Sequence, residues 1–566
     1  MSLGLTACSD QMDYNEFRVN DEEFVKRDFG NVGAFTTHIY RDLDYDWGQM
    51  YGGASLCSAT DEAVYSHQGN AIESYYNGAW SPTNANSSIW SACWDAIAYC
   101  NLYLSDYIGL EFPEHKLEKD YKDQMIKYEN YQWEVRFMRA YFYFLLVRQY
   151  GSVPLITENL NAEDANNSEP ASIDEIFAFI DSECDAIKDE IIQDYSGAYN
   201  SIENEPGRVN NLGVLALRAR AALYNASPLF TQGKSDSEVK ELWHQAALRN
   251  KECLDECRKR GMKLASDYSK LFGSDNWSNS DSSKEIIFAR RLAASNDFEK
   301  RNFPIGMEGG NGGNCPTENL VSAYEMTNGL PIDDPNSGYD PQNPYKDRDI
   351  RLGYTVALNG EKWPDQLPTE ALETWFGGAN SRSVAYGTPT GYYLKKYVDR
   401  TAKISGTGVT STTHTWILFR LGQVYLDYAE AMLNYTGSGY NTADELTMSA
   451  ADAINTVRNR AGQPEIASGL SFSDFEKRYE NERFVELAFE GHRMFDVRRW
   501  MKGPQYFSDI KVMEITKNGD DTFTYTPVVN PSYITKRTWP GDKAYFWPIP
   551  QAEVLKSGKL TQNPGW

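Results

Sequence analysis

Apolar residues recur at helical spacing along most of this 566-residue chain, and this periodicity constrains the fold more than any other feature of the sequence. Helical signals dominate, and strand signals are few. We therefore predict a mostly α fold. The helical pattern covers residues 31–45, 88–107, 121–149, 173–190, 211–226, 239–260, 415–435, 449–461 and 473–501.

Two stretches between these segments have a different composition. Residues 266–413 are rich in Gly, Pro, Asn, Asp and aromatic residues, and residues 66–90 are crowded with aromatic residues between two predicted helices. Long segments without regular structure are uncommon in compact domains unless they bind something. We therefore expect a functional site in these loops.

Part of the helical pattern has the spacing of a known repeat. The sequence "LGQVY" at residues 421–425 matches the Leu-Gly-x-x-Tyr core of a tetratricopeptide helix, and residues 135–154 and 211–228 are looser echoes. Such repeats are helical hairpins that stack to share a core. A generic pair of helices explains the same spacing, and the spacing alone does not decide between them.

The charge of the chain argues against one class of partner. Its formal net charge is −25, whereas binding to phosphates needs clustered Lys and Arg residues that release counterions. Nucleic acid is therefore disfavoured as a partner. No run of 18 apolar residues occurs, so the sequence predicts no membrane-spanning helix.

Motifs of common enzyme classes are absent from the sequence. The histidines show no HExxH spacing, and neither a GxSxG nucleophile elbow nor a GxGxxG dinucleotide loop occurs. The run "DDPNSGYD" at residues 333–340 concentrates oxygen ligands that suit Ca²⁺, but it lacks the length and the final Glu of an EF-hand loop. A solvated turn is the favoured interpretation, and no cofactor is predicted.

One charged stretch, residues 481–500, offers an acid–base hypothesis. Glu482, Glu486 and Glu490 follow one another at i, i+4 spacing and share one face of a predicted helix. Two carboxyl groups about 5–10 Å apart would suit a glycoside hydrolase. The interleaved arginines, however, offer each carboxylate a partner that lowers its pKa and spoils it as a general acid. A structural role is therefore favoured over catalysis.

The eight cysteines do not form a recognisable metal or disulfide pattern. Cys253 and Cys257 lie one helical turn apart, but no third and fourth ligand is nearby, so we interpret them as small apolar residues. Without Cys8 the count is odd, which does not suggest a disulfide framework. The stretch "LTAC" at residues 5–8 fits the cleavage pattern of a bacterial lipoprotein, in which Cys8 would carry the lipid.

Aromatic residues supply the remaining binding signal. Tyr75, Trp80, Trp277 and Trp375 lie in polar loop contexts rather than on helical stripes. An exposed indole face can stack on the C–H face of a sugar ring while nearby polar groups bond the hydroxyls. For any single residue of this set, packing into a small core beneath its own loop is at least as good an explanation.

Several longer motifs occur in a fixed order along the chain. They are "LTAC" at 5–8, "RFMRAYFYFLLVRQYGSVPLI" at 136–156, "DRDIRL" at 347–352, "ILFRLGQVYLDYAEAML" at 417–433, "INTVRNRAG" at 454–462, "ERFVELAFEGHRMFDVRRW" at 482–500, and "FWPIPQAEV" with "NPGW" at the end. In this combination the whole chain resembles the SusD-like (RagB/SusD) outer-membrane lipoproteins of Bacteroidetes.

This resemblance implies a SusD-like fold, in which four tetratricopeptide-like helical pairs form a scaffold packed against a loop-rich ligand-binding half. It also implies lipidation at Cys8 and a position on the outer membrane facing the cell exterior. There the protein would act as a hinged lid on a TonB-dependent SusC-like transporter. Family members bind glycans without cleaving them, so we expect a non-catalytic protein that binds glycans and delivers them to the transporter. A tetratricopeptide-type scaffold for a protein or peptide, and a glycoside hydrolase, are the alternatives.

The same resemblance divides the chain into an anchor and one large domain. Residues 1–7 are interpreted as the remnant of a signal peptide or an added start, residues 8–30 as a lipid-anchored tether, and residues 31–566 as a single domain. The predicted parts of this domain are a helical scaffold mainly at 31–265 and 414–501, binding loops mainly at 266–413 and 60–90, and an irregular C-terminal part at 502–566. Binding residues vary within the family, so they are transferred by region only. Trp80 and Trp277 are the leading candidates, followed by Tyr75, Asp61, Arg382 and Tyr392.

Overall fold

The structure, a computed structural model, describes residues 22–44, 46, 50–86 and 88–566. The predicted lipidation site Cys8 and most of the predicted tether lie outside these ranges. The α-helices are α1 Glu22–Lys26, α2 Phe29–Tyr40, α3 Ser74–Asn77, α4 Ser88–Asp106, α5 Tyr121–Tyr150, α6 Ala162–Asn166, α7 Ile173–Ile187, α8 Asn211–Ala226, α9 Asp236–Lys259, α10 Tyr268–Leu271, α11 Asp297–Asn302, α12 Glu318–Ala323, α13 Ile350–Thr355, α14 Leu421–Thr436, α15 Ala450–Arg460, α16 Phe472–Glu486, α17 Arg493–Arg499, α18 Gly503–Tyr506 and α19 Gln551–Lys556.

The strands are short and form two-stranded antiparallel ladders. They are β1 Ala63–Tyr65, β2 Val153–Pro154, β3 Pro170–Ala171, β4 Ile286–Arg291, β5 Asn314–Pro316, β6 Val356–Ala357, β7 Tyr393–Leu394, β8 Thr415–Arg420, β9 Lys511–Lys517 and β10 Phe523–Val529. The prediction of a mostly helical fold with few strands is confirmed. Within the described ranges, no helix combines the length and the apolar character that crossing a bilayer requires.

The long helices form a continuous scaffold around α5, which is the longest of them at 30 residues. In its second half every residue from Phe137 to Val147 is buried, so this part of the helix is enclosed on all sides and forms the centre of the core. α4 and α7 pack on α5, and contacts then run from α7 to α8, α8 to α9, α9 to α14 and α14 to α15. The arrangement of these helices as four tetratricopeptide-like pairs stays a prediction.

Local signals in the sequence explain where several of these helices begin. Ser172 and Ser235 are the N-cap residues of α7 and α9, and each forms a capping box. The serine side chain accepts a hydrogen bond from the backbone N–H of Glu175 or Glu238, whose carboxylate accepts one from the serine N–H. The cysteines of the described residues are all free and buried. Cys253 and Cys257 thus behave as small core residues of α9, as the sequence indicated.

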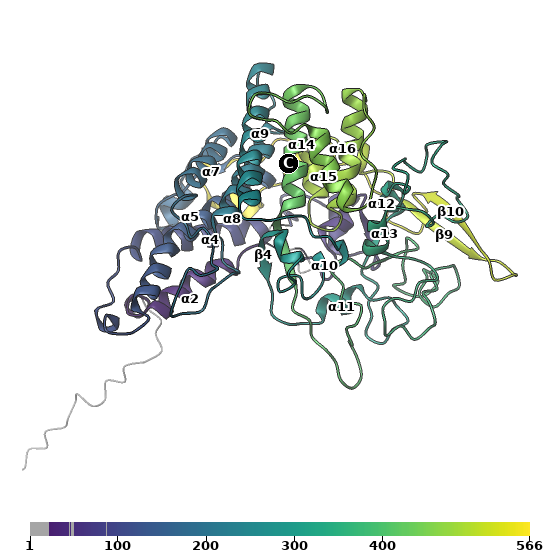
Figure 1. Ribbon diagram of the computed structural model, residues 1–566, viewed down its shortest axis with the longest axis horizontal. Helices are drawn as coiled ribbons and strands as arrows, with labels where there is room; N and C mark the ends of the chain where they lie inside the picture. The colour runs from purple at the N-terminus through teal and green to yellow at the C-terminus, as the bar shows by residue number, and fades with distance from the viewer. Residues whose placement is uncertain (1–21, 45, 47–49, 87) are drawn as a thin grey trace, which may run out of the picture.

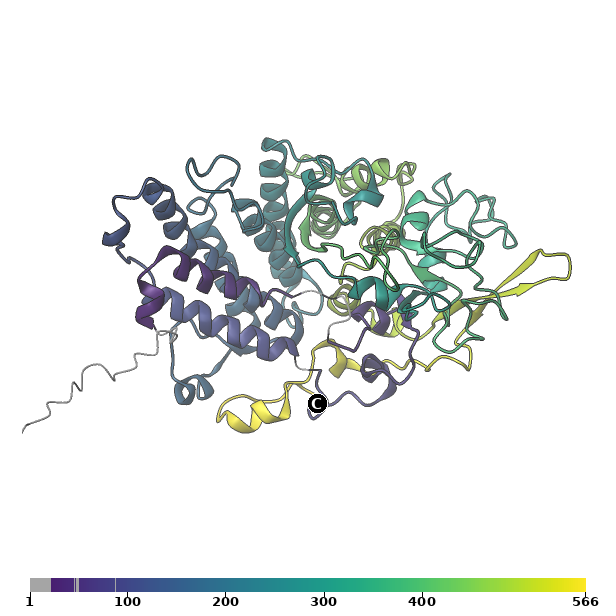
Figure 2. The same ribbon diagram turned by 90° about the horizontal axis from the view of Figure 1, so that it is seen from below.

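The loop-rich half lies beside this scaffold. Figures 1 and 2 show the N-terminal helices at one end of the molecule, α9 and α14–α16 in the middle, and the loops around α12 and α13 at the other end. Between residues 266 and 413 the elements are short and joined by long irregular segments. The hairpin β9–β10 projects beyond these loops in both views.

The structure differs from the predicted helices in three places. Residues 415–420, predicted as the start of a helix, form β8, and the helix follows as α14. The predicted helix 473–501 is broken between α16 and α17, where Phe489 and Gly491 have positive φ values of 59° and 77°. The part expected to be irregular, residues 502–566, contains the hairpin β9–β10.

The N-terminal boundary also differs slightly from the expected one. The helix α1 lies within the segment that was predicted to be a tether, and α2 begins at Phe29, inside the same segment. The side chain of Asp28 caps α2 by accepting a hydrogen bond from the Gly30 N–H.

Candidate functional site

Two of the predicted ligand residues are sealed in the core. Trp80 is 4% exposed and Tyr75 is fully buried, so the prediction that their rings present an open face is wrong. Trp80 packs against Tyr75 with ring centroids 4.7 Å apart, and against Trp547 and Trp566 at 5.8 and 4.9 Å. The C-terminal end of the chain therefore covers the loop that looked exposed in the sequence.

Two further predicted ligand residues, Asp61 and Tyr392, are buried as well. Both carboxylate oxygens of Asp61 accept hydrogen bonds from Arg493, at 2.8 and 2.7 Å. The Tyr392 hydroxyl donates to the Glu318 carboxylate. Both side chains are thus buried and occupied by partners inside the protein, so neither is presented to a ligand at the surface.

The remaining two predicted residues are accessible. Trp277 is half-buried, and the guanidinium carbon of Arg291 lies 5.5 Å from its ring centroid. Arg382 is exposed and lies between two aromatic rings, 4.6 Å from the Phe376 centroid and 4.0 Å from the Tyr533 centroid. Its Nη2 donates to Glu514 Oε1 at 3.1 Å. Arg382 is therefore the predicted residue around which an open polar–aromatic surface forms.

A stack of three rings lies next to this arginine. His67 is parallel to Tyr386, with centroids 4.0 Å apart and an interplanar angle of 8°, and it stacks on Tyr65 at 5.3 Å and 25°. Tyr65 is buried, His67 is half-buried and Tyr386 is 55% exposed. Tyr386 thus forms the outer end of a stack that is anchored in the core, and its outer face is open.

The β1–β5 ladder brings the inner two rings to this place. Tyr65 pairs with Asn314, and directly beyond the ladder the Ser66 N–H donates to the Gly313 carbonyl at 2.9 Å. His67 Nε2 then donates to the carbonyl of Asn311 at 2.7 Å, which fixes the plane of the imidazole. A ladder between segments almost 250 positions apart in the sequence therefore sets the orientation of His67.

The outer ring is held by a tight loop at residues 381–388. Tyr386 has a φ of +64°, a conformation that costs energy for a residue with a bulky side chain and that the surrounding structure must hold in place. The backbone of Gly312 packs directly against this loop, so that a Cβ at Gly312 would lie 2.3 Å from the Tyr386 carbonyl oxygen. Gly387 has no room for a Cβ either, since it would lie 2.0 Å from the Ser381 carbonyl oxygen.

Hydrogen bonds connect the ring stack to the arginine cluster. The Gln68 side-chain amide donates to the Tyr533 carbonyl, and the Tyr533 hydroxyl donates to Glu514 Oε1 at 3.0 Å. Burial of the Tyr533 hydroxyl raises its pKa, so the phenol stays neutral and keeps this hydrogen bond. We name the resulting surface the aromatic platform. It consists of His67, Phe376, Arg382, Tyr386, Glu514 and Tyr533.

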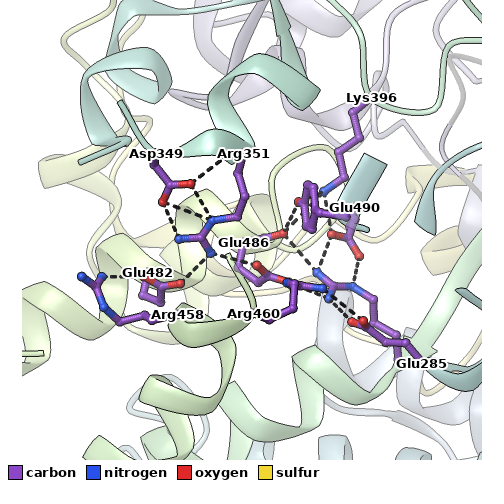
Figure 3. Close-up of polar contacts among 11 residues, drawn as sticks. Glu285, Asp349, Arg351, Lys396, Arg458, Arg460, Glu482, Glu486 and Glu490 are labelled. Carbon is purple, nitrogen blue, oxygen red and sulfur yellow. Dashed lines mark hydrogen bonds and ion pairs between the residues drawn. The ribbon is translucent and has the colours of Figure 1, made fainter. Parts of the chain in front are cut away.

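The carboxylates considered for acid–base catalysis lie elsewhere, in a buried network of charges (Figure 3). Glu482, Glu486 and Glu490 are 1%, 0% and 7% exposed. Glu486 accepts hydrogen bonds from Arg351 and Arg420 at 2.8 Å each and also from Arg460. Although burial raises the pKa of Glu486, the guanidinium groups of Arg460, Arg420 and Arg351 hold it well below its ordinary range. The carboxylate is therefore ionised at neutral pH and shielded from solvent.

The partners of these carboxylates are not the interleaved arginines that the sequence suggested. Arg351 precedes them by more than 100 positions. Arg420 is the last residue of β8, and Arg458 and Arg460 lie on α15. The interleaved arginines bind other carboxylates: Arg483 pairs with Asp427 and Asp496, Arg493 with Asp61, and Arg499 with Glu430 and Asp496. The structural interpretation of the stretch is confirmed, whereas its predicted pairing is wrong.

Glu62 stands next to this network and yields a prediction about pH. Its carboxylate is 1% exposed and accepts the Phe489 N–H at 2.7 Å. Burial raises its pKa to about 8, because the Phe489 N–H, Arg493 and Lys396 offset the burial only in part. A carboxyl group with a raised folded-state pKa contributes stability below its unfolded pKa, and this contribution is lost as the pH rises toward 8. The loss amounts to roughly 1.4 kcal/mol per pH unit across this window.

We therefore expect Glu62→Gln to flatten the dependence of stability on pH. The melting temperature of the variant should match the native protein near pH 5 and exceed it at pH 8, measured by circular dichroism. Glu203→Gln, on an exposed residue, serves as the control. Parallel profiles for the native and Glu62→Gln proteins would contradict this assignment.

The candidate calcium run, residues 333–340, forms turns. Asp334 and Asp340 use their carboxylates to accept the backbone N–H groups of Asn336 and Gln342, at 2.7 and 2.9 Å. Such contacts are typical of Asx turns. Among the residues that the structure describes, no group of three or more His, Cys, Asp or Glu side chains is arranged to hold a metal ion.

Five platform residues escaped prediction from the sequence: Glu514, which lies on β9, and the four rings of His67, Phe376, Tyr386 and Tyr533. His67 falls inside the aromatic stretch 66–90 that drew attention, and the other three rings are loop aromatics flanked by Gly, Ser or Pro, as in "WFGG", "VAYGTP" and "NPSYIT". An aromatic residue next to small residues is the signal that would have found three of them. The tryptophans of the polar loops were considered first, and none of them belongs to the platform.

The comparisons with known proteins agree with this architecture. The model of the SusD family matches residues 284–566, and a second family model, described as starch-binding associating with outer membrane, matches residues 34–215. A SusD-like protein of Bacteroides ovatus is 25% identical over 457 residues, which is 76% of this chain and 73% of that protein.

Solved structures extend the similarity to the fold of nearly the whole chain. A SusD-like protein from Bacteroides fragilis superposes with a TM-score of 0.75 at 22% identity, covering 96% of this chain and 98% of that one. A SusD-like carbohydrate-binding protein from the same species gives 0.72 at 22% identity, covering 94% and 99%. A helical scaffold that carries a loop-rich half is thus the SusD-like fold. The chain belongs to the SusD family.

Proposed function

We propose that this chain is a non-catalytic glycan-binding protein of the outer membrane and that it holds carbohydrate on the aromatic platform. One observation supports this site above all others: the stack of Tyr65, His67 and Tyr386 ends in an exposed ring whose supporting ring is fixed to the backbone. A preorganised ring costs little conformational entropy on binding. It offers an apolar face to the C–H groups of a sugar.

Polar groups around the open ring suit the hydroxyls of the same ligand. Arg382 keeps donors beyond the one that it gives to Glu514, and the Glu514 carboxylate keeps lone pairs beyond those that Arg382 and Tyr533 use. Phe376, which is 60% exposed, lies against the other side of Arg382 and extends the apolar surface. Trp277 remains a second candidate ring, because its side chain is half-buried rather than sealed.

Binding without cleavage belongs to this proposal. A hydrolase needs an acid and a second carboxylate on either side of an open ligand site. The three carboxylates that the sequence offered for this role are buried and ion-paired with arginines. The proposal also includes delivery of the ligand to a SusC-like TonB-dependent transporter and anchoring through lipidated Cys8. The match to a family model described as associating with outer membrane supports this location.

The test is calorimetric titration of the full chain with plant, microbial and mucin glycans. We expect saturable, weak binding, with a Kd above about 1 µM, because an open surface buries little of a ligand and the ligand must be released to a transporter. Chromatography of each glycan after prolonged incubation should show no shorter fragments. Release of fragments would contradict the non-catalytic assignment, and an inert panel would contradict glycan binding.

A further inference from the structure

A cavity of about 590 Å³ lies away from the residues of the aromatic platform. Its walls are the C-terminal end of α2, residues 204–208 and the end of β4. Four arginines line it, Arg41, Arg208, Arg290 and Arg291, against a single carboxylate, that of Glu205. This excess of positive charge is unexpected in a chain with a formal net charge of −25.

One arginine and the carboxylate are already neutralised within the wall. Arg208 pairs with Glu134 at 2.9 Å and with Glu205 at 2.8 Å. Glu205 pairs in addition with Lys127 at 2.7 Å. These four side chains balance one another, so the wall on this side holds its shape and contributes no net charge to the cavity.

Among the other three arginines, Arg41 and Arg291 carry the charge that a ligand could meet. Arg290 donates to the Leu43 carbonyl, Arg41 donates to His38 Nε2 at 3.3 Å, and Arg291 stacks on Trp277. Arg41 and Arg291 are exposed. Neither forms an ion pair with a carboxylate of a described residue. Asp42 carries a counter-charge near Arg41 and Arg290 that offsets part of this charge, although burial raises the pKa of its carboxyl group.

The end of α2 does not cancel this charge. A helix C-terminus carries a partial negative charge on its last carbonyl groups. Here the carbonyls of His38, Ile39 and Tyr40 accept the N–H groups of Arg41, Asp42 and Leu43 at 3.0, 3.1 and 3.3 Å. These carbonyl groups are therefore hydrogen-bonded to the backbone rather than left free at the cavity.

We propose that this cavity binds a small anionic ligand, namely a carboxylate, sulfate or phosphate group carried on a sugar-sized molecule. Arg41 and Arg291 form no ion pair with a described carboxylate, and Arg41 keeps donors beyond the one that it gives to His38. The planar geometry of a guanidinium group matches an oxyanion with two parallel hydrogen bonds. The volume falls within the range of about 300–1,000 Å³ that small-molecule sites occupy. The half-buried ring of Trp277, behind Arg291, holds that guanidinium in place.

Calorimetric titration of the full chain with three probes tests the proposal: glucuronate, inorganic phosphate and uncharged glucose. We expect glucuronate to bind, glucose not to bind at this site, and the affinity for glucuronate to fall as salt is added. Arg41→Gln and Arg291→Gln should each weaken binding by about tenfold or more, because each removes charge-assisted hydrogen bonds. If phosphate binds as tightly as glucuronate, the cavity recognises any oxyanion. If phosphate binds more weakly, the cavity recognises a sugar acid.

Matched variants separate this site from general charge effects and from the platform. Arg258→Gln removes the same charge from an arginine on α9 that pairs with Asp255 on the surface, and it should leave glucuronate affinity unchanged. Tyr386→Ala should leave it unchanged too. The proposal is overturned if glucuronate and phosphate both fail to bind at millimolar concentration. It is equally overturned if Arg258→Gln weakens binding as much as Arg291→Gln in proteins with native circular dichroism.

Discussion

Replacing Glu486 with leucine is expected to lower the free energy of unfolding by about 3–5 kcal/mol. The carboxylate is fully buried and lies among Arg351, Arg420 and Arg460, so its removal leaves three guanidinium groups in the core with one counter-charge fewer. Uncompensated buried charge is among the most destabilising consequences of a single substitution. Thermal and urea denaturation followed by circular dichroism measure the loss.

A matched control distinguishes burial from simple loss of a glutamate. Glu241→Leu changes an exposed glutamate of α9 and is expected to shift stability by less than about 0.5 kcal/mol. Glu486→Gln keeps the shape and the acceptor but not the charge, and should fall between the two leucine variants. Equal melting temperatures for Glu486→Leu and the native protein would show that the network in Figure 3 does not stabilise the fold.

Replacing Tyr386 with alanine is expected to weaken glycan binding by roughly ten- to a hundredfold, the equivalent of about 1–3 kcal/mol for the apolar contact of one ring face. The ring is the open end of the stack with His67, so no other side chain takes over its face. Alanine keeps the Cβ and therefore the backbone cost at a φ of +64°. Titration with the glycan that binds the native protein best gives the ratio of Kd values.

Two companion variants define the cause of the loss. Tyr386→Phe keeps the ring and should stay within about threefold of the native affinity if stacking dominates over the hydroxyl hydrogen bond. Phe472→Ala removes an exposed ring at the start of α16 and should leave affinity unchanged. A Tyr386→Ala protein that binds as tightly as the native protein would move the ligand site away from the platform.

The long helices could be predicted because each repeats one apolar pattern over many turns. Residues 211–226 were predicted as the helix that α8 forms, and α5 differs from its prediction by one residue. Residues 415–420 failed because "TWILFR" is buried at every position and so shows no period that separates a strand from a helix. The break before α17 depends on tertiary contacts, since the Phe489 N–H is held by Glu62, more than 400 positions earlier.

The family could be predicted from ordered motifs, whereas the candidate site could not be predicted residue by residue. Trp80 has polar neighbours in sequence, but Trp547 and Trp566 cover it from the far end of the chain. The local sequence gives no sign of such a cover. Arg382 was predicted only through its region, the loops at 266–413, and it is exposed there. Tyr386 was missed because its support, His67, is brought to it only by the β1–β5 ladder.

The platform draws on distant parts of the chain, with His67 near the start, Arg382 and Tyr386 past the middle, and Tyr533 close to the end. During translation the ribosome therefore releases the last of these rings only when synthesis is almost complete. No shorter nascent chain possesses the full ligand surface. A chain that ends just before residue 533 therefore lacks part of the platform, even though its helices up to α17 are complete.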